Sequence, residues 1–489
     1  DLYSDGPVEE ELLEIAKNYQ EKELNQLIYE RNSWPVLYHF SHIRQNILEW
    51  LPITKEQKVL EIGSGCGPIT GVLARKAKSV TCIDLSKMRS TINAYRNREC
   101  DNVKIMVGNF QDVESSLTEK YDYITLIGVF EYGEAYIQSE TPYVDFLKII
   151  SRHLKPDGKI VLAIENRLGL KYWAGCTEDH FGTLFEGLEG YPTTSGVKTF
   201  SRKEMSAILK EAGDLKASWY YPFPDYKLPM TIYSDRRLPL KGELNRLETN
   251  YDRLRLQLFQ ESAVYDSLLA NDMYPDFANS FLLLIGKEKK EAETIYVKFS
   301  NERDPAFSVR TEICENSSGR RYVRKLPTEK TSEEHVKNLE KISRELGTFY
   351  GREGLELNTC TVENDGVRLE YLQGETLEGR LDELLEAGKT EELEKLFFSY
   401  IKKIRRIHEG EMFFKTPEFV QVFGDAEISE SCRCSGMSNI DLVPANILLQ
   451  DSEVSVIDYE WTFRFPIPCN FILYRMIHYY LESDGKRAV

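Results

Sequence analysis

The chain has 489 residues, of which 42% are hydrophobic, so it is long enough to build packed cores in two to four domains. Its 79 acidic residues outnumber its 62 basic residues and leave a net charge of −17. This balance argues against nucleic acid or an anionic membrane as a partner, because both need a basic surface. No segment approaches the roughly 20 apolar residues that cross a bilayer. The nine cysteines form no framework of pairs, which indicates a reducing, cytoplasmic location.

The pattern of residues 1–58 predicts a helical lead-in to the first domain. Residues 9–29 are charged and amphipathic, which favours a helix, and Trp34-Pro35 is expected to end that helix. A second helix is predicted over residues 38–51, before Pro52. The lead-in is consistent with ordinary packing helices and equally with a cover over a ligand cleft.

A glycine-rich turn follows the first predicted strand. Residues 59–62 form a short apolar run typical of a buried strand, and residues 69–77 have the pattern of a helix. Between them Gly63, Gly65 and Gly67 stand at alternate positions, where backbone N–H groups can approach a ligand that a Cβ would push away. The dinucleotide-binding fingerprint needs a third glycine five residues after Gly63, but Pro68 stands there. The turn therefore fits the pattern E-x-G-x-G-x-G better.

Strand and helix patterns then alternate as far as residue 285. Strands are predicted at residues 59–62, 79–84, 103–107, 121–127, 159–164, 216–221 and 280–285, and helices at 69–77, 87–98, 143–154 and 201–212. This alternation predicts an α/β fold with a Rossmann-like parallel sheet and helices on both faces. We place this domain at residues 59–287, with insertions at 173–199 and 222–279 that could wall a cleft. A charged run at residues 287–293 is expected to be a solvated linker.

The residues at the strand ends are candidates for a binding site, because ligands of such sheets bind beyond the carboxyl ends of the strands. Glu61 ends the first strand and can hold the glycine turn or a cationic amino group. Asp84 ends the second strand and is followed by Leu85; an acid at this position, about 20 residues after the turn, accepts ribose hydroxyls.

The third and fourth strands end in residues that suit an adenosine. Asn109 can bond the adenine edge, Phe110 can stack beside the ring, and Gly128 lets the chain pass close to the ligand. Residues 59–286 resemble the class I S-adenosylmethionine-dependent methyltransferases, although that family often has Asp at the position of Asn109. The resemblance implies S-adenosylmethionine as cofactor and in-line transfer of its methyl group. It also implies a set of cofactor-binding residues: Glu61, Gly63, Gly65, Gly67, Asp84, Leu85, Asn109, Phe110 and Gly128.

The chemistry of the methyl acceptor stays open between a hydroxyl and a phosphate. A hydroxyl requires a general base, for which the candidates are Glu131, His153, Asp179 and His180. A phosphate is already anionic at neutral pH and needs basic residues for binding instead. The candidates for that role are Arg167, Lys171, Arg202 and Lys203. Each of these residues is also consistent with an ordinary structural or surface role.

A second motif stands near the end of the chain, in a predicted domain at residues 288–489. Asp441 and Asn446 are five residues apart, since 446 − 441 = 5, and Asp458 follows an apolar run. In phosphoryl transfer one Asp takes the proton of the substrate hydroxyl, while an Asn and a second Asp hold the Mg²⁺ ions that bridge the ATP phosphates. The order and spacing therefore predict Asp441 as the catalytic residue and Asn446 and Asp458 as metal ligands.

This second region resembles the protein-kinase-like folds, and residues 457–461 look most like aminoglycoside and choline kinases. The resemblance implies an α+β bilobal domain that binds ATP and Mg²⁺, with Lys325 on the phosphates and Glu340 as the ion-pair partner of Lys325. Asn439 stands where these kinases usually have His, and no clear glycine-rich loop precedes Lys325. Because 31 residues follow Asp458 (489 − 458 = 31), we expect a short or truncated C-lobe. A domain that binds without catalysing also stays open.

A methyltransferase followed by a kinase-like domain resembles the bifunctional methyltransferase–kinases that cap bacterial O-polysaccharides. That resemblance implies phosphorylation of a sugar hydroxyl followed by methylation. It also implies a glycan or sugar-phosphate acceptor and peripheral association with a glycan-synthesis complex. Two alternatives stay open. One is a single-activity methyltransferase for a sugar hydroxyl or amine, with a non-catalytic kinase-like module. The other is a scaffold whose two pockets sense ligands.

Overall fold

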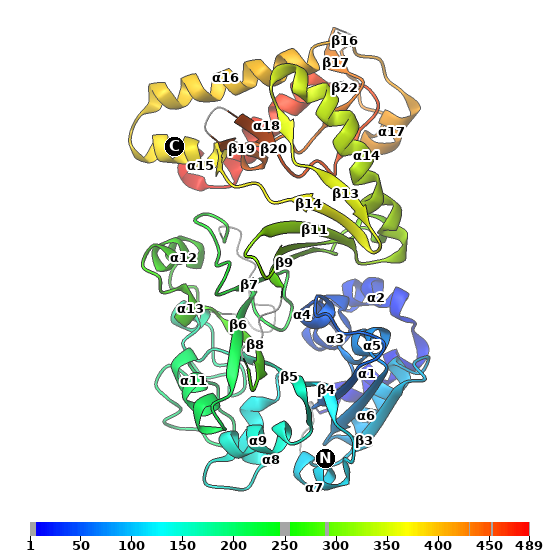
Figure 1. Cartoon of the computed structure of the whole chain (residues 1–489), viewed down its shortest axis with the longest axis vertical. Helices are drawn as coiled ribbons and strands as arrows, with labels where there is room; N and C mark the ends of the chain where they lie inside the picture. Colours follow the sequence, from blue (N-terminus) through cyan, green and yellow to red (C-terminus); the bar gives the residue numbers. More distant parts are fainter. Residues whose placement is uncertain (1–5, 245–254, 289–292, 430, 451–452, 489) are drawn as a thin grey trace. The chain divides into compact units, whose positions relative to one another are not determined.

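The computed structural model describes residues 6–244, 255–288, 293–429, 431–450 and 453–488, and the chain divides into two compact units, Asp1–Phe299 and Ser300–Val489 (Figure 1). The division lies later than the predicted boundary at residue 287, because strand β9 (Thr294–Ser300) pairs with β7 (Thr231–Ser234) of the first unit. Residues 289–292 of the predicted linker lie outside the described residues. Within the described ranges, no helix is both long and apolar enough to cross a membrane.

The first unit is built around one mixed sheet with the strand order β9-β7-β6-β8-β5-β4-β1-β2-β3. The other strands are β1 (Lys58–Ile62), β2 (Ser79–Asp84), β3 (Val103–Val107), β4 (Tyr121–Ile127), β5 (Leu154–Glu165), β6 (Lys216–Phe223) and β8 (Ser280–Gly286). Strands β1 to β5 pair in parallel, as predicted, whereas β6 to β9 pair antiparallel. The prediction of a wholly parallel sheet is therefore wrong beyond β5. Residues 224–230 join β6 directly to β7, and a parallel pair would need a longer crossover.

The helices of the first unit include several that the sequence pattern did not separate. They are α1 (Val8–Asn18), α2 (Leu24–Arg31), α3 (Trp34–Phe40), α4 (Asn46–Glu49), α5 (Thr70–Lys76), α6 (Lys87–Arg96), α7 (Phe110–Val113), α8 (Gly133–Tyr136), α9 (Pro142–Ser151), α10 (Leu170–Trp173), α11 (Arg202–Glu211), α12 (Glu261–Ala270) and α13 (Tyr274–Phe277). The lead-in thus breaks into shorter helices than predicted. The Trp34-Pro35 pair begins α3 rather than ending a helix, because the first turn of a helix leaves its N–H groups unpaired and tolerates proline.

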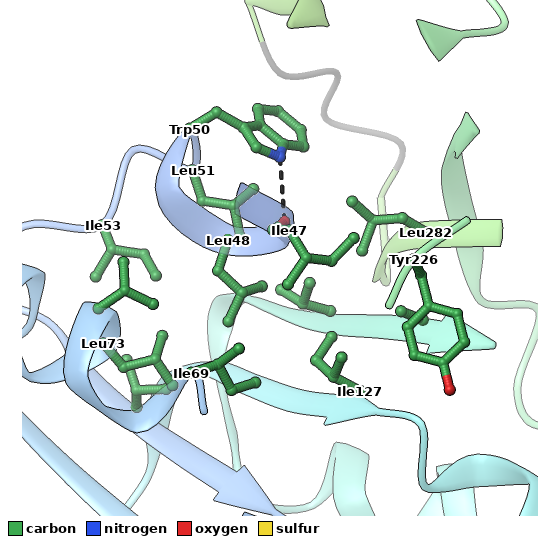
Figure 2. Close-up of a cluster of buried hydrophobic side chains, with 14 of the residues drawn as sticks. Ile47, Leu48, Trp50, Leu51, Ile53, Ile69, Leu73, Ile127, Tyr226 and Leu282 are labelled. Carbon is green, nitrogen blue, oxygen red and sulfur yellow. Dashed lines mark hydrogen bonds between the residues drawn. The ribbon is translucent and has the colours of Figure 1, made fainter. Parts of the chain in front are cut away.

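Side chains along the strands point alternately to the two faces of the sheet, and both faces are buried. On β5, Val161 and Ala163 join a hydrophobic cluster with α4 and α5, while Ile160 and Leu162 point to the opposite face, and all four are fully buried. Figure 2 shows part of the cluster, including the Trp50 Nε1–H that donates a hydrogen bond of 3.2 Å to the carbonyl of Ile47. A buried indole N–H needs such a partner, so this bond lets Trp50 sit in the core.

The second unit combines a small antiparallel sheet with a helical part around one hydrophobic cluster. The sheet has the order β13-β14-β11-β10, and a second sheet has the order β12-β20-β19-β15. The strands of these two sheets are β10 (Val309–Glu315), β11 (Arg321–Pro327), β12 (Glu356–Leu357), β13 (Cys360–Glu363), β14 (Gly366–Glu370), β15 (Glu375–Thr376), β19 (Ile447–Gln450) and β20 (Glu453–Val456). Shorter strands are β16 (Glu411–Met412), β17 (Arg433–Ser435), β18 (Ser438–Asn439), β21 (Thr462–Phe463) and β22 (Ile467–Pro468). The helices are α14 (Glu333–Tyr350), α15 (Leu377–Glu386), α16 (Thr390–His408), α17 (Pro417–Phe423) and α18 (Cys469–Glu482).

Candidate functional site

The turn after β1 has a backbone that glycine adopts far more easily than other residues. Gly63, Gly65 and Gly67 have φ angles of +70°, +51° and +74°, in the left-handed region. A Cβ on Gly63 would lie 2.4 Å from Cγ2 of Val129, whereas a Cβ on Gly65 would meet no described atom within 4 Å. Packing therefore requires the glycine at Gly63, and Gly65 faces open space.

A cavity of about 400 Å³ opens beside this turn, a size typical of a small-molecule site. Its wall comes from the lead-in, the glycine turn, the end of β2 and the segment after β4. The lining residues are Val8, Trp34, Pro35, Tyr38, His39, Arg44, Gly63, Ser64, Gly65, Cys66, Pro68, Ile69, Asp84, Leu85, Arg89, Ile127, Gly128, Val129, Tyr132 and Tyr136. Five of the predicted cofactor-binding residues thus lie on the wall: Gly63, Gly65, Asp84, Leu85 and Gly128.

Asp84 connects the end of β2 to the glycine turn. Its Oδ2 accepts a hydrogen bond from the N–H of Gly65 at 2.7 Å, and its Oδ1 accepts one from the N–H of Ser86 at 2.9 Å. Burial raises the pKa of Asp84, and these two backbone donors oppose that rise. The carboxylate thus fixes the conformation of the turn. It also lies on the cavity wall, where it can accept hydrogen bonds from the hydroxyl groups of a ribose.

Two predicted residues support the turn from behind and, among the described residues, do not line the cavity. The buried Glu61 accepts a hydrogen bond of 2.7 Å from Oγ1 of Thr70 at the start of α5, and burial raises the pKa of Glu61 to about 7. A Cβ on Gly67 would lie 2.3 Å from Oδ1 of Asn93 on α6. Glu61 therefore fixes the helix behind the turn, and Gly67 allows α6 to approach.

The predicted adenine contacts of Asn109 and Phe110 do not match their positions. Asn109 caps α7, its Oδ1 accepting a hydrogen bond of 3.1 Å from the N–H of Gln111. This cap starts the helix at Phe110, whose ring is 1% exposed and packs at 5.5 Å from the ring of Phe146. Among the described residues, neither side chain lines the cavity. Phe110 therefore belongs to the core.

Sequence reasoning left the role of the lead-in open, and the structure brings α3 and the residues after it to the cavity. The guanidinium of Arg44 stacks at 4.2 Å over the ring of Tyr38 and donates a hydrogen bond of 2.9 Å to the carbonyl of Lys227. Lys227 belongs to the second insertion, so Arg44 ties that insertion to the lead-in. The aromatic run at residues 34–40 was the available signal, since rings beside a glycine turn suit a flat ligand.

A buried cluster of charged side chains lies next to the segment after β4. Glu165 ends β5, and Nζ of Lys227 lies 3.0 Å from its Oε1. Asp179 contacts the ammonium groups of both Lys227 and Lys171, the latter at 3.0 Å. His180 approaches Oε2 of Glu165 to 3.9 Å. These residues come from β5, from α10 and from both insertions, so the two insertions each contribute charged side chains to the cluster.

Two carboxyl groups of this cluster have opposite protonation tendencies. Burial, and then the negative charge of Glu165, raise the pKa of Glu131 well above its usual range. Burial also acts to raise the pKa of Glu165, but the positive charges of Lys227, His180 and Lys171 together outweigh it, so the pKa of Glu165 ends below its usual value. Glu131 therefore carries a proton more readily than Glu165 does. Such a separation between neighbouring acids is common where a protein moves a proton.

The residues predicted to act as a general base or to bind a phosphate lie in different surroundings. Of the four candidate bases, Glu131, Asp179 and His180 join the cluster, whereas Nε2 of His153 pairs elsewhere, at 2.6 Å from Glu114. Three of the four expected phosphate ligands are paired with acids, and Lys203 is exposed. These pairs are Arg167 with Glu204 (2.8 Å), Lys171 with Asp179 (3.0 Å) and Arg202 with Asp235 (2.8 Å).

In the second unit, most of the predicted residues converge. Nζ of Lys325 lies 2.5 Å from Oδ1 of Asp458 and 3.0 Å from Oε2 of Glu460. Asn446 donates a hydrogen bond of 2.9 Å to the carbonyl of Asp441. Burial, and then the charge of Asp458, raise the pKa of Asp441.

Two features of this second site differ from the prediction. Glu340 lies 3.8 Å from Arg344, one turn away on the same helix, and Lys325 takes Glu460 as its glutamate partner instead. Sequence reasoning missed Glu460, although it stands only two residues after Asp458. Asp441 also pairs with Arg475 of α18, at 2.7 Å.

Comparison with known proteins matches part of the first unit. Residues 37–216 match a family model described as a methyltransferase domain. The chain is similar to Ribosomal RNA small subunit methyltransferase A of Borreliella burgdorferi, with 23% identity over 236 residues, which cover 45% of this chain and 76% of that protein. It is also similar to an uncharacterized methyltransferase of Staphylococcus carnosus, with 32% identity over 117 residues, 24% of this chain and 51% of that protein.

Solved structures show a weaker likeness. The structure of Phosphoethanolamine N-methyltransferase 1 from Haemonchus contortus superposes with a TM-score of 0.33 and 17% identity, over 58% of this chain and 51% of that one. The chain thus spans about half the length of this protein and of the Staphylococcus relative.

The matched segment and the glycine turn with its acid on β2 define a class I S-adenosylmethionine-dependent methyltransferase domain. Residues 37–216 therefore belong to a methyltransferase domain of this class. The site fits the cofactor, because Gly65 leaves open space at the turn and Asp84 stands on the same wall. When bound, S-adenosylmethionine supplies an electrophilic methyl group. The predicted residues that line the cavity and would hold the cofactor are Gly63, Gly65, Asp84, Leu85 and Gly128.

Proposed function

We propose that the first unit methylates a hydroxyl of a sugar or glycan precursor that enters beside Tyr132. The observation that carries this proposal is the position of Tyr132, which lines the cofactor cavity while its hydroxyl lies 3.1 Å from Nδ1 of His180. One side chain thereby links the cavity to the buried charged cluster. A hydroxyl must lose a proton as it accepts a methyl group, and the cluster offers groups that can take part in that transfer.

The pairing of the nearby cations favours a hydroxyl over a phosphate. Lys171 and Lys227 are buried among Asp179, Glu165 and Asp225, so an incoming phosphate would have to displace carboxylates that already neutralise them. An RNA acceptor, as in the name of the Borreliella relative, is disfavoured by the net charge of −17.

We further propose that the second unit is an ATP-dependent kinase that phosphorylates a hydroxyl of the same glycan. The support is the convergence of Lys325, Asp441, Asn446 and Asp458, which are the residue types that phosphoryl transfer requires. In this proposal Asn446 and Asp458 hold Mg²⁺ and Lys325 holds the ATP phosphates. The ion pair between Asp441 and Arg475 first separates, and Asp441 then accepts the proton of the sugar hydroxyl. In the competing proposal, the second unit binds a ligand without catalysis, which the Asp441–Arg475 ion pair favours.

The test offers the purified chain a panel of bacterial surface glycans and their precursors with methyl-labelled S-adenosylmethionine, with and without Mg²⁺ and ATP. We expect methyl label without ATP, and separate phosphate label when the ATP carries it. Methyl label that depends strictly on ATP would overturn the hydroxyl acceptor and restore the order of phosphorylation before methylation. Absence of phosphate label from every glycan would support the non-catalytic second unit.

Two matched variants make this test specific. Asp84→Asn removes the charge on the cavity wall and is expected to lower methyl transfer at least tenfold. Asp157→Asn makes the same change at an exposed position on β5 and is expected to leave transfer unchanged. Equal activity of the two variants would contradict the placement of the cofactor.

A further inference from the structure

The buried charged cluster of the first unit contains three groups with the arrangement of metal ligands. Glu131 stands in the short 3₁₀ helix Phe130–Tyr132 after β4, Glu165 ends β5, and His180 belongs to the first insertion. One ligand atom from each lies within 4.8 Å of the others. A divalent ion about 2.1 Å from each ligand needs separations of roughly 3–4 Å, so a small closure brings the three atoms to a common centre.

The same atoms lack hydrogen-bond partners among the described residues. They are Oε2 of Glu131, both carboxylate oxygens of Glu165, and Nε2 of His180. Glu131 is 1% exposed and Glu165 is fully buried. Lys227 forms an ion pair with Oε1 of Glu165 without hydrogen-bond geometry. Buried polar atoms are nearly always partnered, so the three atoms that remain, Oε2 of Glu131, Oε2 of Glu165 and Nε2 of His180, indicate a bound ion.

Nε2 of His180 is oriented to act as a metal ligand. Its Nδ1 lies 3.1 Å from the hydroxyl of Tyr132, and a proton on Nδ1 leaves a lone pair on Nε2, the atom that faces Glu165. Histidine ligands of metals commonly make such a bond through the nitrogen that does not bind the ion. Tyr132 would therefore fix the ring as well as line the cofactor cavity.

The charges around the three groups leave room for a dication. Four carboxyl groups, Glu131, Glu165, Asp179 and Asp225, surround two ammonium groups, Lys171 and Lys227, an excess of two negative charges when all are ionised (4 − 2 = 2). Another buried acid, Glu178, accepts hydrogen bonds from the backbone N–H groups of His180 and Phe181. Asp179 contacts both ammonium groups, which leaves Oε2 of Glu165 to face His180.

We propose that Glu131, Glu165 and His180 bind one divalent first-row transition ion beside the cofactor cavity. Two carboxylates and one imidazole suit Mn²⁺ or Zn²⁺, because the imidazole nitrogen disfavours Mg²⁺ and Ca²⁺. Three protein ligands leave further coordination positions open. If the proposed methylation is correct, an oxygen of the acceptor would occupy one of them and be held next to Tyr132.

The test measures binding of the metal itself. The full chain is stripped with a chelator and titrated with Mn²⁺ and with Zn²⁺ by calorimetry, and Mn²⁺ binding is repeated by electron paramagnetic resonance. All proteins carry Asp458→Asn, which removes a candidate metal ligand of the second unit. We expect one ion per chain, with affinity lowered at least tenfold by Glu131→Gln, Glu165→Gln or His180→Gln.

The control is His153→Gln, which changes a histidine paired with Glu114 outside the cluster and should leave binding unchanged. Circular dichroism confirms that each variant is folded. If neither metal binds, or if Glu131→Gln and Glu165→Gln bind as the parent does, the proposal is overturned and Glu131 holds a proton instead of sharing an ion. Methyl transfer is scored separately, so a metal site without methylation, or methylation that survives the loss of metal, distinguishes the two proposals.

Discussion

Gly65→Ala should separate the stability of the glycine turn from its role in binding. At φ +51° an alanine costs about 1–2 kcal/mol of backbone strain, and reduced freedom of the unfolded chain returns about 0.4–1 kcal/mol. Because a Cβ there meets no described atom within 4 Å, no clash adds to this cost. The expected loss of stability is therefore about 1 kcal/mol, or roughly 2–4 °C in the melting temperature.

The alanine side chain would project into the cavity in which S-adenosylmethionine is expected to bind. We expect calorimetry to show at least a tenfold loss of S-adenosylmethionine affinity, about 1.4 kcal/mol, on top of the small loss of stability. Gly196→Ala is the matched control, because Gly196 also has a positive φ, of +89°, and open space at its Cβ, but it does not line the cavity among the described residues. Unchanged cofactor affinity in Gly65→Ala, or an equal loss in Gly196→Ala, would refute the assignment of the turn.

Three further predictions concern substitutions at single residues. Burial raises the pKa of Glu61 from its usual 4.5 to about 7, so its contribution to stability is present below pH 4.5 and is lost as the pH rises through 7. Glu61→Gln should therefore be more stable than the parent at pH 8, by up to about 3 kcal/mol in denaturant unfolding, with a smaller difference at pH 5; an equal difference at both values would be evidence against the buried charge. Gly128→Ala places a Cβ 2.7 Å from the hydroxyl oxygen of Tyr226 and should lower the melting temperature, and Tyr226→Phe in the same chain should restore part of the loss. No recovery in the double variant would leave backbone strain as the whole cause. Lys325→Met should abolish Mg–ATP binding measured by calorimetry, whereas Lys337→Met, at an exposed ion pair on α14, should not; equal binding by both would count against the kinase proposal.

Much of the wall of the cavity beside the glycine turn followed from the sequence, because it depends on local rules. Three glycines at alternate positions after a strand predicted a turn whose backbone can approach a ligand, and in the structure all three have left-handed φ angles. Asp84 and Gly128 were found because parallel strands bring their carboxyl ends to one edge, whatever packs around them. Phe110 could not be assigned by the same rule. The cap at Asn109 begins a helix there and turns the ring toward Phe146, and a strand-end position does not encode that rotation.

The alternation of strands and helices up to β5, the glycine turn and the acid of β2 were determined by the sequence itself, because each depends on residues that are close together in the chain. The charged cluster was decided by tertiary structure. Lys227 and Asp179 are 48 residues apart in two insertions without a repeating pattern, yet their charges meet beside Glu165. In the second unit, Lys325 and Glu460 are separated by 135 residues. Charges so distant in sequence pair when the packing of apolar elements removes them from water, so their partners are chosen by the fold as a whole.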